Sequence, residues 1–294
     1  MVPRWGICGE SEMIALLLGG LMMTESYIAP GAAIEKLPGT YRFTEGACWT
    51  KKGTLIFSDI PMSKIYEWDG KEMIVWRDGS NNANGNTVDG EGNVWSCEHG
   101  SRSVVVYRDG VPTPVAKEFG GKKLNSPNDV AIHSSGRVLF TDPSYGIRPE
   151  QMEVDGKYVY ELVPGGELKQ LWKGRNQPNG LVFSPDGKRL YVADSEDGGI
   201  DLFDYSPGTV KHIKKFDSQG PDGVRVDVDG RVWAACGDGV NVYSADGALL
   251  ENIKFPEQPS NLCFGGEDGK TLFVTARKGV YSLRVRVVGV RPGF

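Results

Sequence analysis

The sequence is poor in the residues that soft-metal sites require. Its 294 residues include three His and five Cys, and no two Cys have the C-x-x-C spacing. No Ser lies in a G-x-S-x-G context, so the chain lacks the nucleophile elbow of many serine hydrolases. These absences disfavour a Cys/His zinc site and a serine nucleophile.

The cysteines do not form a disulfide pattern. Cys48, Cys97, Cys236 and Cys263 fall inside predicted strands, and Cys8 lies in the N-terminal tail. An odd number without regular spacing indicates small buried thiols rather than a disulfide framework. We therefore expect a cytoplasmic protein, with a periplasmic or secreted one as the alternative.

The chain also lacks a long hydrophobic run. The apolar run Met13–Met23 is too short to span a membrane. It is a poor signal peptide, because Glu10 and Glu12 precede it and no A-x-A cleavage site follows. We interpret residues 1–30 as an N-terminal extension, with disorder as one interpretation, and residues 31–294 as a single domain.

Basic residues are not in excess. The 33 Lys and Arg are outnumbered by 38 Asp and Glu, which gives a formal net charge of −5. This balance argues against nucleic acid and anionic membranes as partners. It does not predict an oligomeric state.

What the chain does contain is a repeated β-hairpin. In one copy, Asn179 opens an alternating apolar strand, Gly187 closes a tight turn, and a second apolar strand ends at Asp194. The same eight-residue spacing joins a polar opening residue to a turn glycine in six places: Glu45 with Gly53, Asn84 with Gly92, Asn128 with Gly136, Asn179 with Gly187, Asp222 with Gly230, and Asn261 with Gly269.

The spacing of these hairpins predicts the architecture. Successive opening residues are 39, 44, 51, 43 and 39 residues apart. Repeats of this length, built only from strands and turns, predict an all-β fold: a six-bladed β-propeller with four-stranded blades around a central channel. We expect residues 32–37 to add the outermost strand to the last blade, and the tail after Arg277 to supply another.

The six opening residues are candidates for a metal site. Each begins the innermost strand of a blade, so all six should converge on one end of the channel, and all are oxygen donors: Glu45, Asn84, Asn128, Asn179, Asp222 and Asn261. Two carboxylates with several amides suit a hard divalent cation, Ca²⁺ before Mg²⁺ or Mn²⁺. Asn and Asp are also ordinary turn residues, but Glu45 is not a turn former and favours the metal interpretation.

The second strands of the hairpins return to the same end of the ring. Asp59, Asp142 and Asp194 end three of them, and they either orient the ligands or bind backbone amides of neighbouring turns. Glu98 and His99 end another. Since His99 is the one histidine expected near this end, it is a candidate for acid–base chemistry or substrate contact.

Several motifs together resemble the gluconolactonase family, also called the senescence marker protein or regucalcin family. The resemblance covers about residues 40–285 and is greatest with the bacterial gluconolactonase branch. The motifs that carry it are TEGACW (44–49), CEHG (97–100), NSPNDV (125–130), LFTDPSYG (139–146), QPNGL (177–181) and PDGVRVD (221–227).

The resemblance implies hydrolysis of sugar lactones, of the D-glucono-1,5-lactone type, to aldonic acids by metal-activated water. By motif match, the metal ligands fall on Glu45, Asn179 and Asp222, with Asn128 a further ligand or a substrate contact, and Asp222 matches the general base. The cofactor would be one divalent cation, Ca²⁺ first, with Mn²⁺, Mg²⁺ and Zn²⁺ as alternatives. Where animal members carry an Arg, this chain has Ser126, so their substrate contacts do not transfer directly.

Further contacts and functions stay open from the sequence. We expect the substrate hydroxyls to meet residues near the openers, namely Asn84, His99, Asn128 and Asp129. A metal-dependent arylesterase or phosphotriesterase-like propeller is one alternative, because such enzymes use similar rings of Glu, Asn and Asp. A non-catalytic binding propeller is the other.

Overall fold

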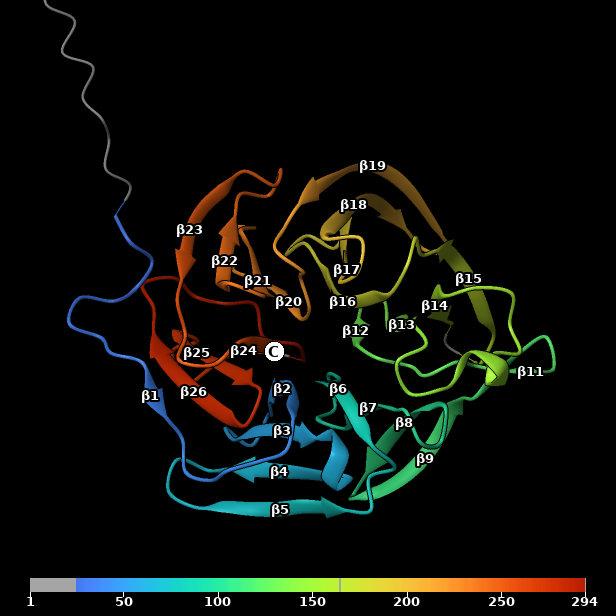
Figure 1. Ribbon diagram of the computed structural model, residues 1–294, viewed down its shortest axis with the longest axis horizontal. Helices are drawn as coiled ribbons and strands as arrows, with labels where there is room; N and C mark the ends of the chain where they lie inside the picture. The colour runs from blue at the N-terminus through green and yellow to red at the C-terminus, as the bar shows by residue number, and fades with distance from the viewer. Residues whose placement is uncertain (1–24, 164, 294) are drawn as a thin grey trace, which may run out of the picture.

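The computed structural model describes residues 25–163 and 165–293, and these form a ring of six antiparallel sheets (Figure 1). Each sheet has four strands, which follow one another in chain order in five blades, while the sixth takes its outermost strand from the N-terminal segment. The sheets surround a central channel. The prediction of an all-β, six-bladed propeller is confirmed. Cys8 and the apolar run Met13–Met23 lie outside the described residues.

The first three blades follow one another along the chain. Blade one comprises β2 (Thr44–Trp49), β3 (Leu55–Asp59), β4 (Lys64–Trp68) and β5 (Met73–Asp78). Blade two comprises β6 (Ala83–Val88), β7 (Val94–Glu98), β8 (Ser103–Arg108) and β9 (Val111–Ala116). Blade three comprises β12 (Val130–Ile132), β13 (Val138–Asp142), β14 (Tyr158–Leu162) and β15 (Leu168–Lys173).

The second half of the ring repeats this order. Blade four comprises β16 (Pro178–Phe183), β17 (Arg189–Asp194), β18 (Gly199–Ser206) and β19 (Thr209–Asp217). Blade five comprises β20 (Val224–Val226), β21 (Val232–Cys236), β22 (Gly239–Tyr243) and β23 (Leu249–Ile253). Blade six comprises β24 (Pro259–Gly265), β25 (Thr271–Ala276), β26 (Gly279–Arg284) and β1 (Glu35–Lys36).

A few short elements lie outside the blades. A small hairpin of β10 (Glu118–Phe119) and β11 (Lys122–Lys123) connects blades two and three. Two short 3-10 helices follow second strands, η1 (Ile60–Met62) in blade one and η2 (Pro149–Gln151) in the long connection of blade three. In the described part of the chain, no helix has the length and apolar character needed to cross a membrane.

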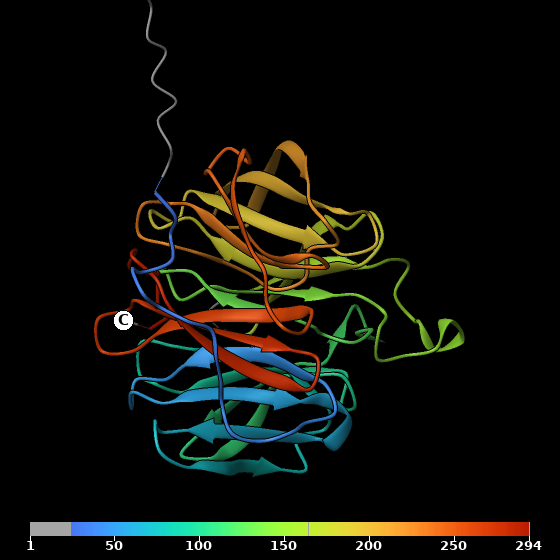
Figure 2. The same ribbon diagram turned by 60° about the vertical axis from the view of Figure 1, so that its left-hand side comes forward.

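The two ends of the domain close the ring in the last blade. β1 pairs antiparallel with β26, which confirms the predicted outermost strand although it is shorter than residues 32–37. The tail after Arg277 supplies β26, also as predicted. Figures 1 and 2 show the N-terminal segment running along the outside of the ring to reach this position. β1 thus covers the outer edge of β26, and the pairing of the two ends ties the ring together.

The chain packs against the ring before the predicted domain boundary at residue 31. Tyr27 and Ile28 pack on the cluster of blades five and six, and the backbone N–H of Tyr27 donates to Glu251 at 2.7 Å. The backbone N–H of Ala29 donates to the carbonyl of Arg284 at 3.0 Å. Residues 25–30 are therefore part of the packed structure.

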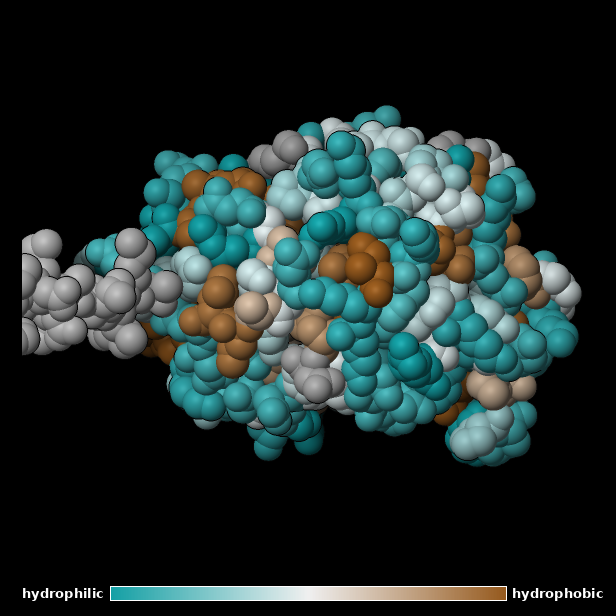
Figure 3. Space-filling model, turned by 90° about the horizontal axis from the view of Figure 1, so that it is seen from above, coloured by the Kyte–Doolittle hydropathy of each residue, from teal (hydrophilic) through white to brown (hydrophobic). Residues whose placement is uncertain are grey.

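The hydrophobic core is divided into clusters between neighbouring blades. In one of them, Leu139 and Val159 of blade three contact Leu181, Leu190 and Phe203 of blade four, and all are buried. Burial of each such side chain contributes about 1.5–3 kcal/mol. The described cysteines, Cys48, Cys97, Cys236 and Cys263, are free and buried, as expected. Seen from the edge of the ring, hydrophobic residues form small separate patches on a mostly hydrophilic surface (Figure 3).

The repeated turn has the same backbone conformation in every blade. The glycine that closes it has a positive φ in all six copies, between +69° and +89°. These residues are Gly53, Gly92, Gly136, Gly187, Gly230 and Gly269. Side chains with a Cβ rarely adopt this conformation, which explains the glycine that repeats in the sequence.

Neighbouring blades are joined to one another at the end of the channel where the innermost strands begin. At every junction, one hydrogen bond reaches the backbone carbonyl of an opening residue or of the residue before it. The bonds are Ser58 Oγ to Asn84 O, Gly85 N to Asn128 O, Thr141 Oγ1 to Asn179 O, Gly180 N to Asp222 O, Gly223 N to Ser260 O, and Ser260 Oγ to Thr44 O. The opening residues are thus fixed relative to each other through the backbone.

This close approach generates a stability prediction at Gly180. A Cβ on Gly180 would lie 2.3 Å from the carbonyl oxygen of Asp222. Gly180→Ala should therefore lower the free energy of unfolding by about 1–3 kcal/mol, measured by urea denaturation. Gly90→Ala is the control, because no atom lies within 4 Å of its added Cβ. Equal stability of the two variants would contradict the close packing of the inner strands.

Candidate functional site

Five of the six opening residues line one cavity at this end of the channel. The cavity has a volume of about 290 Å³, and the predicted residues that line it are Glu45, Asn84, His99, Asn128, Asn179 and Asp222. Phe43, Ile60, Tyr145 and Ser195 complete the lining. The convergence expected from the repeat is therefore present, and only Asn261 lies outside the lining.

Irregular backbone at the start of the inner strands aims these side chains into the channel. The strand register shifts between Glu45 and Cys48 in β2, and between Pro178 and Leu181 in β16. β12 and β20 begin two residues after Asn128 and Asp222. A bulge inserts an extra residue and re-aims a side chain, so each opener leaves the regular alternation of its strand.

Glu45 is held in place by Asn261. The Nδ2 of Asn261 donates to Oε2 of Glu45 at 2.9 Å, and the backbone N–H of Gly46 donates to the same oxygen at 2.7 Å. The Oδ1 of Asn261 accepts from the N–H of Leu262 at 2.8 Å. Because both ends of its amide are occupied, Asn261 orients Glu45 instead of facing the cavity.

Asp222 is the second carboxylate of the cavity, and it and Glu45 disfavour each other's charge. Burial raises the pKa of Glu45 to about 7, against hydrogen bonds from Asn261 and Gly46. Burial and then the charges of Glu45 and Asp129 raise the pKa of Asp222 well above its ordinary value. A cation between the two carboxylates would remove this repulsion.

Asn84 is oriented by His99. Its Nδ2 lies 3.2 Å from Nε2 of His99, and burial lowers the pKa of this imidazole to about 4. The neutral His99 therefore accepts through Nε2 and carries its proton on Nδ1. The Oδ1 of Asn84 is buried and has no hydrogen-bond partner among the described residues. It is an oxygen that a cation or a hydroxyl group would satisfy.

Asn179 is oriented by Ser195, a residue that the sequence analysis did not single out. Nδ2 of Asn179 donates to Oγ of Ser195 at 2.9 Å, and this hydroxyl donates to the carbonyl of Pro221 at 2.7 Å. Tyr145 lies beside both residues, and burial is the main cause that raises its pKa to about 12. Ser195 follows the predicted Asp194 directly, and Tyr145 lies in a connection without strand periodicity.

Asn128 and Asp129 face different surroundings. Asn128 lines the cavity, and its side chain makes no hydrogen bond within the described residues. Asp129 is buried elsewhere in the channel, where Oδ2 pairs with Arg225 at 3.2 Å and Oδ1 accepts from the N–H of Val130 at 2.9 Å. Asp129 therefore does not line the cavity in which its contact with substrate was expected, and its carboxylate is used by Arg225.

The acidic residues that end the second strands bind backbone amides. Asp59 accepts from the N–H groups of Arg42 and Phe43 at 3.0 and 3.1 Å. Asp194 accepts from those of Asn176 and Gln177 at 2.8 and 3.0 Å. Asp142 likewise accepts from the backbone N–H of Asn125 at 2.8 Å. Glu98 differs, because it accepts from the side chains of Asn81, Ser101 and Tyr107. Of the two interpretations left open, the geometry favours the structural one: these residues hold the segments that lead into the inner strands.

The donor set fits a hard divalent cation. Among the described residues, no three His, Cys, Asp or Glu side chains come together in the manner of a metal cluster. The cavity instead combines two carboxylates with the side-chain amides of Asn84, Asn128 and Asn179. Ca²⁺, Mg²⁺ and Mn²⁺ take such all-oxygen sets, whereas zinc prefers nitrogen and sulfur.

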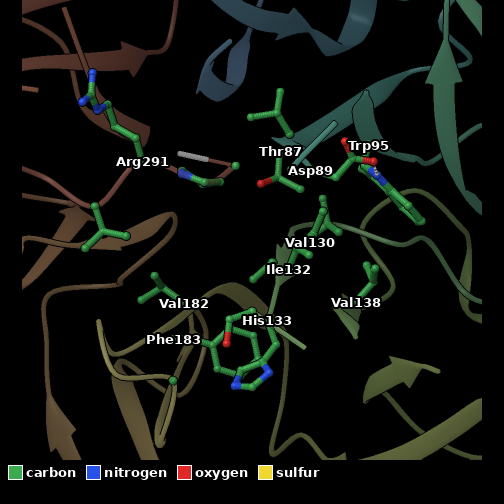
Figure 4. Close-up of a pocket in the computed structure, with 18 of the residues that line it drawn as sticks. Thr87, Asp89, Trp95, Val130, Ile132, His133, Val138, Val182, Phe183 and Arg291 are labelled. Carbon is green, nitrogen blue, oxygen red and sulfur yellow. Dashed lines mark hydrogen bonds between the residues drawn. The ribbon is translucent and has the colours of Figure 1, made fainter. Parts of the chain in front are cut away.

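A larger cavity lies toward the opposite end of the channel (Figure 4). It measures about 930 Å³ and is lined mainly by apolar residues of blades two to four, such as Val130, Ile132 and Phe183, with residues 290–293 of the tail. Its charged residues are already paired in large part, since Asp89 accepts from Trp95 at 2.9 Å and Arg225 binds Asp129. The smaller cavity is therefore the candidate site.

Comparison with known proteins agrees with this geometry. The family model described as the SMP-30/Gluconolactonase/LRE-like region matches residues 43–278. The gluconolactonase of Zymomonas mobilis subsp. mobilis is 31% identical over 294 residues, covering 87% of this chain and 82% of that protein. The regucalcin of Xenopus laevis is 29% identical, covering 81% and 84%.

A solved structure shows the same relationship. XC5397 from Xanthomonas campestris, described as a gluconolactonase important in glucose secondary metabolic pathways, has a TM-score of 0.83 and 31% identity, covering 88% of this chain and 91% of that chain. The resemblance seen in the motifs is confirmed, and the chain belongs to the SMP-30/gluconolactonase/LRE-like family.

Proposed function

We propose that this protein is an enzyme that hydrolyses sugar lactones to aldonic acids, with one divalent cation in the 290 Å³ cavity. The observation that carries the proposal is the convergence of Glu45, Asp222 and three Asn side chains on that cavity. The gluconolactonases among its relatives support the same activity.

The lining suits a small polyhydroxylated ring. Asn84, Asn128 and His99 offer amide and imidazole groups that can hydrogen-bond to hydroxyls. Phe43 and Ile60 form an apolar part of the wall on which the C–H face of a sugar ring can pack. D-Glucono-1,5-lactone combines these two features, and it is the substrate type that we propose.

Ca²⁺ is the cation that we propose, with Mn²⁺, Mg²⁺ and Zn²⁺ as alternatives. Glu45, Asn179 and Asp222 would hold it, and Asn128 would be a further ligand or a substrate contact. Two carboxylates balance the charge of one divalent ion, and the amides add oxygen atoms without adding charge. When bound, such a cation supplies Lewis-acid activation of the lactone carbonyl and of water.

The reaction needs no covalent nucleophile from the chain. Asp222 accepts a proton from the attacking water, whose oxygen bonds to the lactone carbonyl carbon. The ring C–O bond then breaks, the ring oxygen leaves as a hydroxyl group after taking up a proton, and the product is the aldonic acid. Asn261 keeps Glu45 in place throughout, and His99 stays neutral and holds the amide of Asn84.

One observation favours a second candidate function. Phe43, Ile60 and Tyr145 give the cavity an apolar side that a sugar lactone uses only in part. An aryl ester or a phosphotriester would fill this side with its leaving group. A metal-dependent arylesterase or phosphotriesterase-like activity is therefore the alternative, and a non-catalytic binding propeller is the remaining one.

Metal removal tests the proposed reaction. The purified protein should lose hydrolysis of D-glucono-1,5-lactone after treatment with EDTA and regain it on addition of Ca²⁺, because the cation supplies the Lewis acid. The measurement is proton release in weak buffer, with the uncatalysed rate subtracted, and Mn²⁺, Mg²⁺ and Zn²⁺ are compared with Ca²⁺. Hydrolysis of phenyl acetate or paraoxon without lactone hydrolysis would support the alternative, and no activity in a folded sample would support a binding propeller.

Substitution of Asp222 tests the assignment of the base. Asp222→Ala should lower kcat by about 10²–10⁴-fold or more, because a general base and a cation ligand are lost together. The ring should still fold by circular dichroism, since removal of Asp222 relieves repulsion with Glu45. Asp204→Ala, an exposed carboxylate on β18, is the matched control. Full activity of Asp222→Ala would overturn the assignment.

A further inference from the structure

The orientation of the Asn179 amide decides whether this side chain can bind a cation. The two ends of an amide have nearly the same shape, yet only Oδ1 can bind a cation. Asn179 lines the cavity on the side of blade four, and we propose it as a ligand of the cation. Its neighbours decide which end is available.

The carbonyl of Pro221 determines the hydrogen-bond direction of Ser195. A backbone carbonyl only accepts, so the Ser195 hydroxyl must donate its single hydrogen to Pro221, at 2.7 Å. Its oxygen is then left as an acceptor toward Asn179, at 2.9 Å. Only the NH₂ end of the amide can donate to it, which leaves Oδ1 as the free end.

Ser195 is itself held firmly. Its backbone N–H donates to the carbonyl of Gln177 at 3.3 Å, and Asp194 next to it binds the N–H groups of Asn176 and Gln177. The segment that leads into Asn179 and the turn that carries Ser195 are therefore one hydrogen-bonded unit. The hydroxyl cannot rotate to another acceptor without losing the bond to Pro221.

The same hydroxyl also connects two blades. Asn179 belongs to blade four, and Pro221 directly precedes Asp222 at the entrance to blade five. Asn179 further hydrogen-bonds the carboxylate of Asp222, which lowers the pKa of that group against the larger effect of burial. Ser195 thus fixes the position of one proposed ligand relative to the other.

We infer that Ser195 is a positioning residue. It turns Oδ1 of Asn179 toward the cation and fixes the position of Asn179 relative to Asp222. The inference rests on the proposed function in treating Asn179 as a ligand. Without the hydroxyl, the NH₂ end of the amide keeps only the carboxylate of Asp222 as an acceptor, so Oδ1 is held less firmly toward the site. Outer partners of this kind typically contribute 10–100-fold in metal affinity.

The test measures the effect of Ser195→Ala in two backgrounds, the wild-type protein and Asn179→Asp. The amide of Asn179 has one oxygen, whereas the carboxylate has an oxygen at both ends. In the wild-type background, Ser195→Ala should raise the Kd for Ca²⁺ about 10–100-fold by isothermal titration calorimetry. Ser195→Thr keeps the hydroxyl and should stay within about threefold of wild type. In the Asn179→Asp background, both ends of the side chain are oxygen, so Ser195→Ala should change the Kd by no more than about threefold.

These results separate positioning of the amide from general support of the fold. An equal loss of affinity in both backgrounds would show that Ser195 acts only by supporting the turn, and no loss in the wild-type background would remove its role altogether. Either result would overturn the inference. A drop in kcat with unchanged KM for Ser195→Ala would accompany the expected loss of affinity at limiting Ca²⁺.

A second readout does not depend on the cation. If the wild-type protein binds none of the divalent ions, the proposed function fails, and the role of Ser195 is then judged in the metal-free protein. The side-chain NH₂ resonances of Asn179 in a ¹H–¹⁵N spectrum should shift in Ser195→Ala and return to their wild-type positions in Ser195→Thr. Unchanged resonances in Ser195→Ala would overturn the inference.

Discussion

The structure depends on the close approach of neighbouring inner strands at one end of the channel. Each junction is bridged by a hydrogen bond to a backbone carbonyl at an opening residue, as between Gly180 and Asp222. The glycine there lacks the Cβ that would collide with that carbonyl, so the strands can meet backbone to backbone. The donors of these bridges are backbone N–H groups or the hydroxyls of Ser and Thr residues other than the openers, so the opening side chains stay free to point into the channel. The ring thus holds five polar side chains around one cavity without using those side chains for its own closure.

This arrangement brings like charges together in a buried place. Glu45 and Asp222 lie in the same cavity. Burial raises the pKa of both carboxyl groups, and the charge of Glu45 raises the pKa of Asp222 further. The surrounding residues then divide into those that face the cavity and those that orient them. Asn261 holds Glu45, His99 holds Asn84, and Ser195 holds Asn179. Each orienting bond leaves an oxygen atom unpaired, which is the arrangement that a hard cation requires.

Much of the fold and part of the site could be predicted from the sequence. The eight-residue spacing from Asn179 to Gly187 recurs because every blade uses the same positive-φ turn, and this made the blade number and the converging residues predictable. Ser195 and Tyr145 were missed because they lie in connections, where no periodicity marks a side chain that turns inward. Asp129 was misplaced because its pairing with Arg225, distant in sequence, decides where its carboxylate points. Asn261 looked equivalent to the other openers, and only its hydrogen bonds distinguish it.

We propose that the opening residues of blades one, four and five, Glu45, Asn179 and Asp222, hold one cation between them. The most direct measurement is a crystal structure of the protein grown with Ca²⁺. The account predicts one ion in the cavity, with oxygen atoms of Glu45, Asn179 and Asp222 at about 2.3–2.6 Å from it. Asn261 should still bind Glu45 in that structure. An ion bound elsewhere, or one coordinated without Glu45 and Asp222 together, would contradict the account.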